Sequence, residues 1–511
     1  MRALISVYDK TDLTPFARGL AELGFELVAS GGTAEHLEAD GLAVTSVESL
    51  TQFPALLGGR VKTLHPAIHG GILARPGNEL DAAELEREGI EPFDLVCVNL
   101  YPFERAAASR GVEAGDVIEQ IDVGGSALLR AAAKTRALVA AATRPQDYDA
   151  VLEELRTRRG ESSLETRRRL AGIAFAATAA YEAAIARWFG EHEQFPQTLI
   201  PVFEKVRDLA YGENPHQAAA LYAERGARSH LLSMVEQLHG RELSFNNLND
   251  LDAARLLVRE FALPACVIVK HANPCGVAVG ASIEEAYERA LGGDQLSAYG
   301  GVVVLNRAVT AALGDRLAEQ FVEVLLAPGF DGAALEVLAR KPATRILNNL
   351  ERRQPVVGEH DYQRVHGGLL VQDRDGDVAD REGMIAVAGK ASEPQWGDLL
   401  FAWRVCKHVA SNAIVIVRDL RTIGIGAGQM SRIDAVRIAI EKAREHEHPL
   451  EGAALASDAF FPFPDGPRLA LEAGVAALIQ PGGSKRDEDV ISAVESAGAT
   501  MIFTGRRHFR H

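Results

Sequence analysis

The first 143 residues alternate short apolar runs with stretches whose apolar residues recur at helical spacing. The apolar runs indicate strands at residues 2–7, 25–30, 43–47, 93–100 and 137–143. Helical spacing predicts helices at residues 13–23 and 31–40, each ending at a glycine. Strands that alternate with helices in this way predict a mostly parallel sheet, and ligands of such sheets bind beyond the carboxyl ends of the strands.

The alanine-rich segment 170–181 carries no charge and lies between Arg169 and Glu182. It is too short for a membrane span, which takes about 18 to 20 apolar residues, and no other uncharged run approaches that length. We interpret it as a buried helix. Ser162 and Glu165 have the spacing of a capping box at its start.

The pattern weakens at residues 190–210, where two prolines and mixed charge indicate a linker. After it, apolar runs typical of strands return at residues 266–270, 300–305, 413–417 and 475–480. The rest of the chain suffices for one large or two smaller α/β lobes. We therefore expect two domains, one of residues 1–195 and one of residues 196–511.

The chain has 511 residues, of which 47% are hydrophobic and 24% charged, a composition typical of a globular protein. Its net charge of −16 argues against a general nucleic-acid binder. It leaves room for small phosphate-bearing molecules, which need only a few focused cations. The four cysteines include no CxxC pair, and the first apolar run is too short for a signal peptide, so we expect a cytoplasmic protein.

Two glycine-containing turns, residues 30–33 and 124–126, open predicted helices. Glycines allow close approach of the backbone, and helix N-termini offer free N–H groups to an anion. Between these turns in the sequence, residues 58–71 gather polar and basic side chains among glycines: Arg60, Lys62, Thr63, His65 and His69. Together the three segments favour a phosphate site, although each one by itself fits a tight turn or a solvated basic loop. His65 and His69 have the i, i+4 spacing of a metal pair, but a proline lies between them and the HExxH pattern is absent.

In residues 267–276 a β-branched apolar run ends in Lys270 and His271. The stretch is open to four interpretations: a metal site, a Cys-His nucleophile pair, a general base beside a cation, or a basic turn after a strand. Zinc deaminases need a glutamate two residues after the zinc-binding histidine and a P-C-x-x-C motif. Asn273 and Ala278 stand at the glutamate and second-cysteine positions, so zinc is disfavoured.

Five motifs of the first half occur in the order of a known family: residues 6–13, 27–37, 58–75, 98–103 and 121–135. They resemble the IMP cyclohydrolase half of the AICAR transformylase/IMP cyclohydrolase family, whose fold in this half is similar to methylglyoxal synthase. The resemblance implies an α/β domain with a parallel sheet. It also implies closure of the formylated nucleotide FAICAR to IMP, in which an amide nitrogen attacks a formyl carbon and water leaves.

Matching positions imply the roles of residues in this half. Lys62 and Tyr101 would contact the reacting formyl and amide groups, Asp122 would act as acid or base, and Lys134 would help to set the charge. The nucleotide and its phosphate would be held by Ser6, Lys10, Ser30, Gly31, Gly32, Thr33, Arg60, Thr63 and Gly124. The plain structural alternatives are a core aromatic for Tyr101 and a helix C-terminal cation for Lys134.

Nine further motifs match the transformylase half of the same family in order: residues 211–217, 243–254, 269–276, 297–305, 327–330, 411–415, 424–432, 457–463 and 481–484. The resemblance therefore covers nearly the whole chain. For this half it implies two α/β lobes resembling cytidine deaminase. The implied reaction transfers the formyl group of the co-substrate 10-formyltetrahydrofolate to AICAR.

Formyl transfer must remove a proton from the attacking amine and stabilise an oxyanion. The resemblance implies that His271 is the acid/base, Lys270 its electrostatic partner and Asn412 a donor to the oxyanion. Lys270 disfavours a protonated imidazole and so keeps His271 able to accept a proton. Transfer from a folate needs no covalent enzyme intermediate, which disfavours Cys275 as a nucleophile. Neighbours on a strand point to opposite faces, so Lys270 and His271 share a site only if the strand ends, and we expect residues 272–276 to form the turn.

Other positions are implied to surround the substrate and the folate: Tyr211, His216, Asn249, Gly300, Glu323, Arg432, Phe460, Phe463, Asp465, Ser484, Arg507, Phe509 and His511. Phe460 and Phe463 are equally consistent with a core corner. Residues 505–511 are equally consistent with a frayed basic tail.

Two positions depart from the family pattern. Ala210 stands where the family has an arginine that meets the substrate phosphate, so either Arg207 or Arg432 replaces it or the affinity for the phosphate is reduced. Met430 stands where a glutamine is usual and removes one polar contact. Neither change touches the implied catalytic residues.

The resemblance further implies a homodimer that acts on small-molecule nucleotides and folate, with no zinc, room for a monovalent cation, and no nucleic-acid or membrane partner. Two rival functions stay open. One is a regulatory module that uses only the phosphate turns of the first half, and the other is an enzyme with one of the two activities. The motifs of the second half argue against the first rival, and supplying FAICAR alone would test the second.

Overall fold

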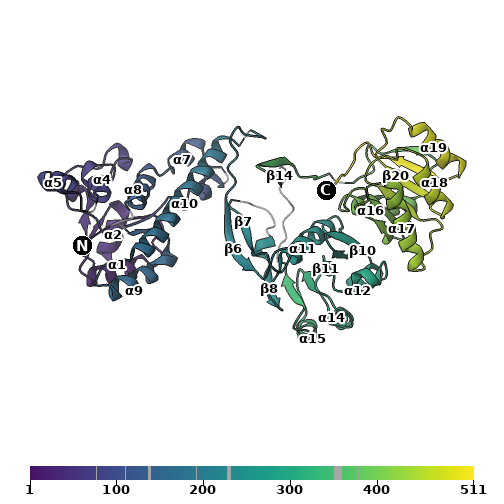
Figure 1. Ribbon diagram of the computed structural model, residues 1–511, viewed down its shortest axis with the longest axis horizontal. Coiled ribbons are helices and arrows are strands. Elements are labelled where there is room, and N and C mark those ends of the chain that lie inside the picture. Colours follow the sequence, from purple (N-terminus) through teal and green to yellow (C-terminus); the bar gives the residue numbers. More distant parts are fainter. Residues whose placement is uncertain are drawn as a thin grey trace. The chain divides into compact units, whose positions relative to one another are not determined.

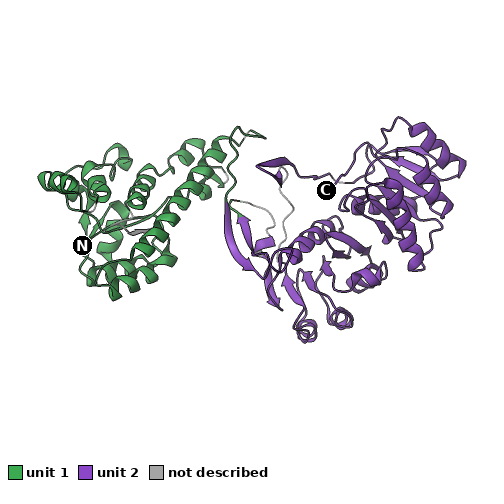
Figure 2. Cartoon of the chain, viewed as in Figure 1, with its two compact units in different colours: residues 1–202, 224–226 green, residues 203–223, 227–511 purple. Residues whose placement is uncertain are grey.

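The computed structural model describes residues 1–75, 77–109, 111–135, 140–191, 193–226, 232–349, 360–377 and 379–511. The chain divides into two compact units (Figure 2). The first comprises residues 1–202 with 224–226, and the second comprises residues 203–223 with 227–511. The expected division at residue 195 falls shortly before this one, in residues 193–202, which form neither helix nor strand.

In the described residues, the first unit holds a five-stranded parallel sheet of order β3-β2-β1-β4-β5. Its strands are β1 (Arg2–Val7), β2 (Glu26–Ala29), β3 (Thr45–Ser46), β4 (Leu95–Asn99) and β5 (Ala140–Ala142). The predicted parallel sheet is therefore confirmed, with a third strand shorter than expected. Residues 137–139 of the predicted fifth strand lie outside the described residues.

Helices cover both faces of this sheet, which explains why its central strands β1, β2 and β4 are mostly apolar. Ile5 contributes to a core with α1 (Leu13–Glu22) and α9 (Tyr148–Thr157). The neighbouring Leu4 faces the other way, into a core with α4 (Pro66–Leu73), α8 (Val123–Lys134) and α10 (Leu164–Phe189). Figure 1 shows these helices around the sheet.

The start of α10 differs from the predicted capping box. Ser163, one residue later than expected, is the N-cap, and its hydroxyl accepts the N–H of Thr166 at 3.1 Å. Ser162 instead accepts from the Arg167 guanidinium through its carbonyl oxygen at 2.6 Å. The Ser162–Glu165 capping box is therefore wrong. The alanine-rich segment is buried along one face of α10, whereas Phe175 on another face is 41% exposed.

The described residues of the second unit form a 12-stranded mixed sheet of order β16-β21-β20-β19-β17-β18-β10-β9-β11-β12-β13-β8. The first half of the unit supplies β8 (Glu236–His239), β9 (Ala265–Lys270), β10 (Asn273–Val279), β11 (Val302–Leu305), β12 (Val324–Ala327) and β13 (Arg345–Asn348). The second half supplies β16 (Ile385–Ala388), β17 (Ile414–Arg418), β18 (Arg421–Gly426), β19 (Ala454–Ser457), β20 (Ala477–Gln480) and β21 (Thr500–Phe503). The halves meet at the pairing of Ala278 with Arg421.

These halves are two α/β lobes with a shared core. On one face of the sheet, α11 (Phe245–Val258) and α16 (Glu393–Cys406) belong to a single apolar cluster. The ring of Phe261, which follows α11, stacks on that of Phe401 in α16 at 4.9 Å. The opposite faces are covered by separate helices: α12 (Ile283–Leu291), α14 (Ala311–Ala318) and α15 (Gly332–Leu338) on the first lobe, and α17 (Arg432–Glu445), α18 (Asp465–Glu472) and α19 (Asp487–Ser496) on the second. The expected α/β class with two lobes in this half is confirmed.

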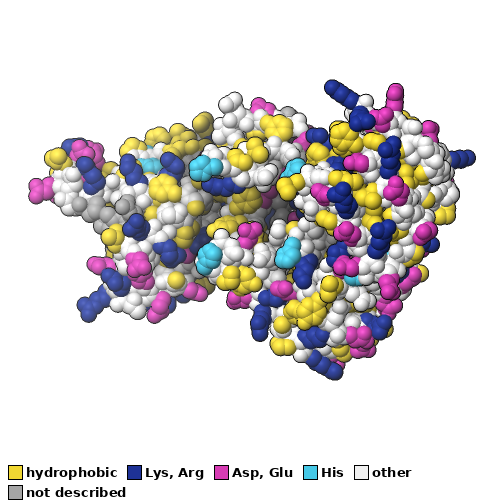
Figure 3. Space-filling view, turned by 45° about the vertical axis from the view of Figure 1, so that its right-hand side comes forward, with side chains coloured by type: hydrophobic (Ala, Val, Ile, Leu, Met, Phe, Trp, Pro, Cys, Tyr) yellow, Lys and Arg dark blue, Asp and Glu magenta, His cyan; other side chains and the backbone are white. Residues whose placement is uncertain are grey.

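Two strand pairs lie outside the large sheet: β6 (Phe203–Leu209) with β7 (Ala219–Glu224), and β14 (His360–Val365) with β15 (Gly368–Asp373). Among the described residues, no helix is both long and apolar enough to cross a membrane. On the face shown in Figure 3, lysine and arginine side chains are interspersed with aspartate and glutamate, so that face carries no single basic patch.

Candidate active sites

The first site lies where the strand order of the parallel sheet reverses, between β1 and β4, at the carboxyl ends of the strands. The Ser6 and Ser30 hydroxyls, at the ends of β1 and β2, lie 3.1 Å apart. Thr33 is buried, and its hydroxyl contacts the N–H and the carbonyl of Val7, both at 3.1 Å. Ser30 precedes α2 (Gly31–Ala39) without capping it, so the first N–H groups of this helix have no side-chain partner from Ser30.

Glycines bring three predicted segments together at this edge. A Cβ atom on Gly31, whose φ is +48°, would lie 3.2 Å from Lys62 Nζ. A Cβ atom on Gly124 would lie 3.0 Å from Thr63 Oγ1. The close approach that glycine allows therefore places the cation and the hydroxyl of the basic loop beside two helix starts. Such a group of N–H, hydroxyl and ammonium donors suits a phosphate.

Asp122 and Tyr101 form a titratable pair next to these turns. Asp122 caps α8 by accepting the N–H of Gly125 at 2.7 Å. Burial raises the pKa of the Asp122 carboxyl. The N–H groups of Gly125 and Tyr101 lower this pKa, but the effect of burial is larger. Burial, and then the charge of Asp122, raise the pKa of the Tyr101 phenol. Tyr101 is 42% exposed, so it is not a core aromatic.

Three further predicted residues of this half make other contacts or lie on other elements. Lys134 ends α8, about 18 Å along the helix axis from Asp122 at its start, which is beyond the reach of its side chain. Arg60 forms an ion pair with Glu119 and is exposed. Lys10 is half-buried at the start of α1, where its carbonyl accepts the N–H of Leu13.

The two histidines of the basic loop lie in different surroundings. His65 caps α4, with Nδ1 accepting the N–H of Ala67 at 3.2 Å. Burial lowers the pKa of His69. Within the part of the chain that the structure describes, no group of three or more His, Cys, Asp or Glu side chains is arranged to hold a metal ion.

Asn99, the last residue of β4, supports this site but was not a predicted site residue. Its Oδ1 accepts the N–H groups of Tyr8 and Asp9 at 2.7 and 2.9 Å, and its Nδ2 donates to the carbonyl of Asp9 at 2.8 Å. Asn99 therefore fixes the loop that carries Lys10. An asparagine directly after a buried strand at the reversal of strand order was the available signal.

The second site contains the predicted Lys270–His271 pair at the end of β9. The turn between β9 and β10 consists of His271 and Ala272, with φ values of +54° and +57°. Positive φ at both central residues is the geometry of a tight two-residue hairpin. The expected turn over residues 272–276 is wrong, because residues 273–276 already belong to β10. Since His271 lies in the turn, the alternation of a strand does not force its side chain away from that of Lys270.

Asp250 of α11 holds this turn, a role that the sequence did not reveal. Its carboxylate accepts the N–H of Ala272 at 2.6 Å and that of His271 at 3.2 Å. Burial raises the pKa of the Asp250 carboxyl, against these N–H groups that lower it. Its neighbour Asn249, a predicted substrate contact, is exposed beside it.

Other predicted residues surround the hairpin. Lys270 donates from Nζ to the carbonyl of Tyr299 at 2.7 Å, next to Gly300, whose φ is +68°. Glu323 accepts from Asn247 Nδ2 at 2.9 Å. Burial raises the pKa of Cys275 to about 12, so this thiol stays protonated at neutral pH and is a poor nucleophile.

A cavity of about 490 Å³ in the second lobe gathers most of the remaining predictions. It is lined by seven of the predicted residues: Asn412, Arg432, Phe460, Phe463, Asp465, Arg507 and Phe509. Phe460 is 39% and Phe463 50% exposed, whereas Phe461 between them fills the core. The core-corner alternative is therefore wrong for Phe460 and Phe463, which offer flat apolar surface to a ligand ring.

Arg432 and Asn412 are held in place by hydrogen bonds. Arg432 is buried, forms an ion pair with Asp458, and donates to Ser457 Oγ at 2.8 Å and to Asn412 Oδ1 at 2.7 Å. Asn412 Nδ2 donates to the carbonyl of Gln429 at 2.7 Å. The guanidinium of Arg432 is therefore occupied by contacts within the protein. Asn412 would have to release a carbonyl to donate to an oxyanion.

Asn273 connects the hairpin to this cavity. Its Nδ2 donates to the carbonyl of His271 at 3.2 Å, and its Oδ1 accepts the N–H of Ala410 at 2.9 Å. Ala410 lies two residues before Asn412. The turn that carries His271 and the segment that carries Asn412 are thus joined through one side chain, which the sequence did not indicate.

Three predicted residues lie at the margins of these groups. The carbonyl of Tyr211 accepts the N–H of Phe245 at 3.1 Å, at the start of α11. His216 is exposed. Ser484 accepts the N–H of Arg486 at 3.1 Å, and the guanidinium of Arg486 lies 5.2 Å from the ring centre of Phe463. Arg207 is half-buried on β6.

Comparison with known proteins places this chain beside purine-biosynthesis enzymes. The family model described as AICARFT/IMPCHase bienzyme matches residues 132–442, and that of the MGS-like domain matches residues 12–127. A bifunctional purine biosynthesis protein PurH of Bacillus mycoides (strain KBAB4) is 48% identical over 514 residues, which cover 100% of this chain and 99% of that protein. The PurH of Magnetococcus marinus is 49% identical over 532 residues, with the same coverage.

Among solved structures, the crystal structure of ForH is 40% identical and covers 38% of this chain and 98% of its own, with a TM-score of 0.35.

Proposed function

Because the chain belongs to the AICARFT/IMPCHase bienzyme family, whose members carry both AICAR transformylase and IMP cyclohydrolase activities, we propose a division of labour between its units. The second unit transfers the formyl group of 10-formyltetrahydrofolate to AICAR. The first unit closes the resulting FAICAR to IMP with loss of water. The observation that supports the transfer site best is the cavity lined by seven residues expected from sequence and joined through Asn273 to the turn of His271.

In the transfer step, the amine nitrogen of AICAR attacks the formyl carbon, and the bond from that carbon to the folate nitrogen breaks. His271, exposed at the hairpin turn, accepts the proton that the amine loses, and a proton passes to the departing folate nitrogen. Lys270 adds positive charge where the oxyanion develops. Asn412 completes the oxyanion contacts once its amide turns from the carbonyl of Gln429.

We place the nucleotide in the cavity with its phosphate towards Arg507. Among the described residues Arg507 forms no ion pair, and its guanidinium lies 4.5 Å from the ring centre of Phe509. Arg432 is already paired with Asp458, so Arg507 is the lining cation free to meet an anion. Arg507 then supplies the charge that the family takes from an arginine at the position of Ala210.

In the cyclisation step, the amide nitrogen of FAICAR attacks its own formyl carbon, and the formyl oxygen leaves as water. Lys62 stabilises the negative charge that develops on that oxygen. Asp122, whose pKa burial raises, holds and returns a proton more readily near neutral pH than an exposed carboxylate would. Tyr101 lies next to Asp122 and orients the reacting groups.

A homodimer in the cytoplasm is part of this proposal. The exposed apolar side chains of Val365, Leu369 and Leu370 on the β14–β15 pair offer a surface that a second copy would cover. Sedimentation at micromolar concentration tests it, with a dimer expected. A monovalent cation stays an expectation from resemblance. The fully buried carboxylate of Asp458 is a natural oxygen ligand for it, but Arg432 already neutralises this group, so no step is assigned to a cation.

Ultraviolet monitoring of purified protein with AICAR and 10-formyltetrahydrofolate tests the function. We expect the spectral change of tetrahydrofolate release followed by IMP formation. With FAICAR alone, IMP should form without folate. A protein that binds AICAR without any spectral change would instead be a binding module.

A further inference from the structure

The last residues of the sequence alternate between two environments. Arg507 and Phe509 line the cavity, whereas Arg506, His508 and Arg510 make polar contacts with other parts of the unit. Alternation with a period of two is that of an extended chain. The residues that face the cavity are therefore placed by the anchors on either side of them, and this segment is not a frayed tail.

His508 is the most buried of these anchors, at 3% exposure. Its Nδ1 lies 2.6 Å from Asp375 Oδ2, and its Nε2 lies 3.7 Å from Asp377. Its ring packs on Trp403 of α16 at 4.9 Å, and its N–H donates to the carbonyl of Asp458 at 3.0 Å. The position of His508 is thus fixed from three sides.

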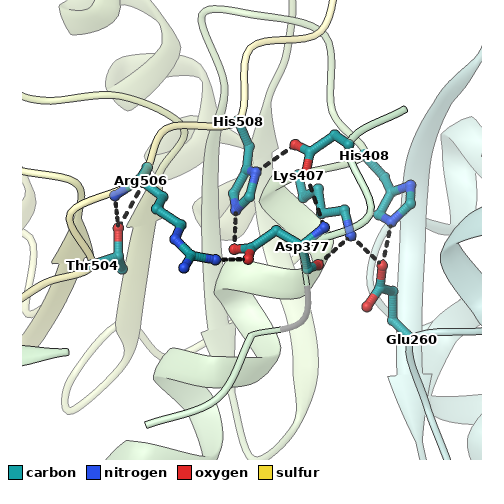
Figure 4. Close-up of polar contacts among 8 residues, drawn as sticks. Glu260, Asp377, Lys407, His408, Thr504, Arg506 and His508 are labelled. Carbon is teal, nitrogen blue, oxygen red and sulfur yellow. Dashed lines mark hydrogen bonds and ion pairs between the residues drawn. The ribbon is translucent and has the colours of Figure 1, made fainter. Parts of the chain in front are cut away.

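Arg506 is anchored to the same acidic segment. It forms an ion pair with Asp377, whose carbonyl accepts from Lys407 Nζ at 2.7 Å. Lys407 in turn donates to Glu260 at 2.8 Å. Figure 4 shows His508, Arg506 and Lys407 converging on Asp377, with Glu260 beyond Lys407. The aspartate is therefore held on the end of α16 and offers a rigid partner.

Arg510 closes the row of anchors. Its guanidinium donates to the carbonyl of His408 at 3.0 Å, and its carbonyl accepts the N–H of Ser411 at 2.9 Å. Ser411 immediately precedes Asn412. The segment with Arg507 and Phe509 is thus aligned along the segment that carries the transfer residue.

We propose that Asp375 and Asp377 are positioning residues for nucleotide binding, which hold Arg507 and Phe509 as one wall of the AICAR pocket. The inference rests on the proposed function of this cavity. The two aspartates take up Arg506 and His508 and leave the charge of Arg507 for the substrate phosphate. Neither aspartate contacts the cavity itself, since neither is among its lining residues.

The consequence is a specific kinetic signature. Without the two carboxylates, residues 506–510 sample other positions. Binding of AICAR must then order this segment, and the free energy needed for this weakens the affinity. The formyl carbon is handled by His271 and Lys270, which the aspartates do not contact in the described hydrogen bonds. The Michaelis constant for AICAR should therefore rise, while kcat and the Michaelis constant for 10-formyltetrahydrofolate stay nearly unchanged.

The test compares Asp375→Asn, Asp377→Asn and the double variant with Asp380→Asn in steady-state formyl transfer. Asp380 is a matched control. It lies in the same segment between β15 and β16 as the two aspartates, but its carboxylate accepts the N–H of Glu382. For the double variant we expect the Michaelis constant for AICAR to rise about tenfold, a loss typical of charge-assisted contacts. Asp377→Glu, which keeps the charge for Arg506, should stay within about twofold of the wild type.

Cyclisation of supplied FAICAR is the internal folding control, because it takes place in the first unit. An AICAR Michaelis constant equal to that of Asp380→Asn, or a parallel loss of both activities, would overturn the proposal. Failure of the proposed function is separate: the wild-type protein itself would then not turn over AICAR.

Discussion

Asp250 acts on the transfer site through two backbone N–H groups, those of His271 and Ala272. Both of these residues have positive φ, a backbone conformation that side chains disfavour, so the turn depends on a partner that stabilises it. A sequence shows an aspartate but not the N–H groups that it accepts from. Residues that act in this way, such as Asn99 and Asn273, were missed for the same reason.

Replacing Asp250 by asparagine should therefore slow formyl transfer without unfolding the protein. The amide keeps one acceptor oxygen, loses the charge, and turns an NH₂ group towards the two N–H groups. We expect kcat to fall about tenfold to hundredfold, as for other misplaced catalytic groups. Cyclisation of FAICAR should be unchanged. Asp252→Asn, on the same helix and paired with Arg255, is the control, and equal rates in the two variants would refute the role of Asp250.

Lys62 was predicted from its place in a motif that matches the family, within a basic loop that also contains glycines. The structure adds its approach to Gly31. Lys62→Ala should abolish cyclisation and leave formyl transfer to AICAR intact, as followed by accumulation of FAICAR. Arg87→Ala is the control, since Arg87 is exposed, pairs with Glu88 and is not a predicted site residue. IMP formation by Lys62→Ala at near wild-type rate would rule out its assigned role.

At the scale of elements, the strands were predictable and their ends were not. Uninterrupted apolar runs gave β1, β2, β4, β9, β17 and β20, because sheets covered on both faces need them. Helix and turn limits depend on single hydrogen bonds. Two serines stand before α10 and only the structure distinguishes them, while the turn of β9 and β10 contains no glycine or asparagine that would have marked positive φ.

The N-cap of α10 can be tested by comparing the two serines. Ser163→Ala removes the acceptor of the Thr166 N–H and should destabilise the first turn by about 1 kcal/mol. Hydrogen exchange in the peptide that covers this turn should become about fivefold faster. Ser162→Ala should change it much less. If Ser162→Ala instead accelerated the exchange more than Ser163→Ala, the capping box of Ser162 and Glu165 would be supported and the N-cap at Ser163 refuted.

Glu260 links the end of α11 to the end of α16. Burial opposes ionisation of its carboxyl, but hydrogen bonds and charge from His408 and Lys407 outweigh it and lower the pKa to about 2. Burial also lowers the pKa of His408, so at neutral pH the imidazole supplies an N–H and Lys407 supplies the charge.

A lowered folded-state pKa means that the carboxylate stabilises the fold above its unfolded value, near 4.5, and that this stability is lost as the pH falls towards 2. His408, whose pKa burial lowers in the folded protein, takes up a proton in the unfolded chain below about pH 6.5. It therefore also lowers the free energy of unfolding as the pH falls. Glu260→Gln should cost about 2 kcal/mol at pH 7 and flatten the acid limb of stability in urea unfolding at several pH values. The exposed Glu495→Gln is the control, and a parallel acid limb in Glu260→Gln and the wild type would contradict the assignment.

At the scale of the whole molecule, the chain divides into two compact units, to each of which we assign one of the two chemistries. The order of motifs along the sequence was enough to predict the α/β class and both halves. It did not reveal that the two lobes of the second unit share a core, because the pairing of Ala278 with Arg421 joins positions far apart in sequence. We therefore expect the two lobes to form one site, in which the hairpin of His271 and the cavity of Arg507 bind the same nucleotide.

The separation of the two chemistries makes His271→Ala the most direct test of this account. Each reaction is assayed on the same purified protein, formyl transfer with AICAR and 10-formyltetrahydrofolate, and cyclisation with FAICAR alone. We expect formyl transfer to be lost and IMP formation from supplied FAICAR to proceed at the wild-type rate. Formyl transfer near the wild-type rate, or loss of both activities together, would contradict the assignment of the two reactions to two separate sites.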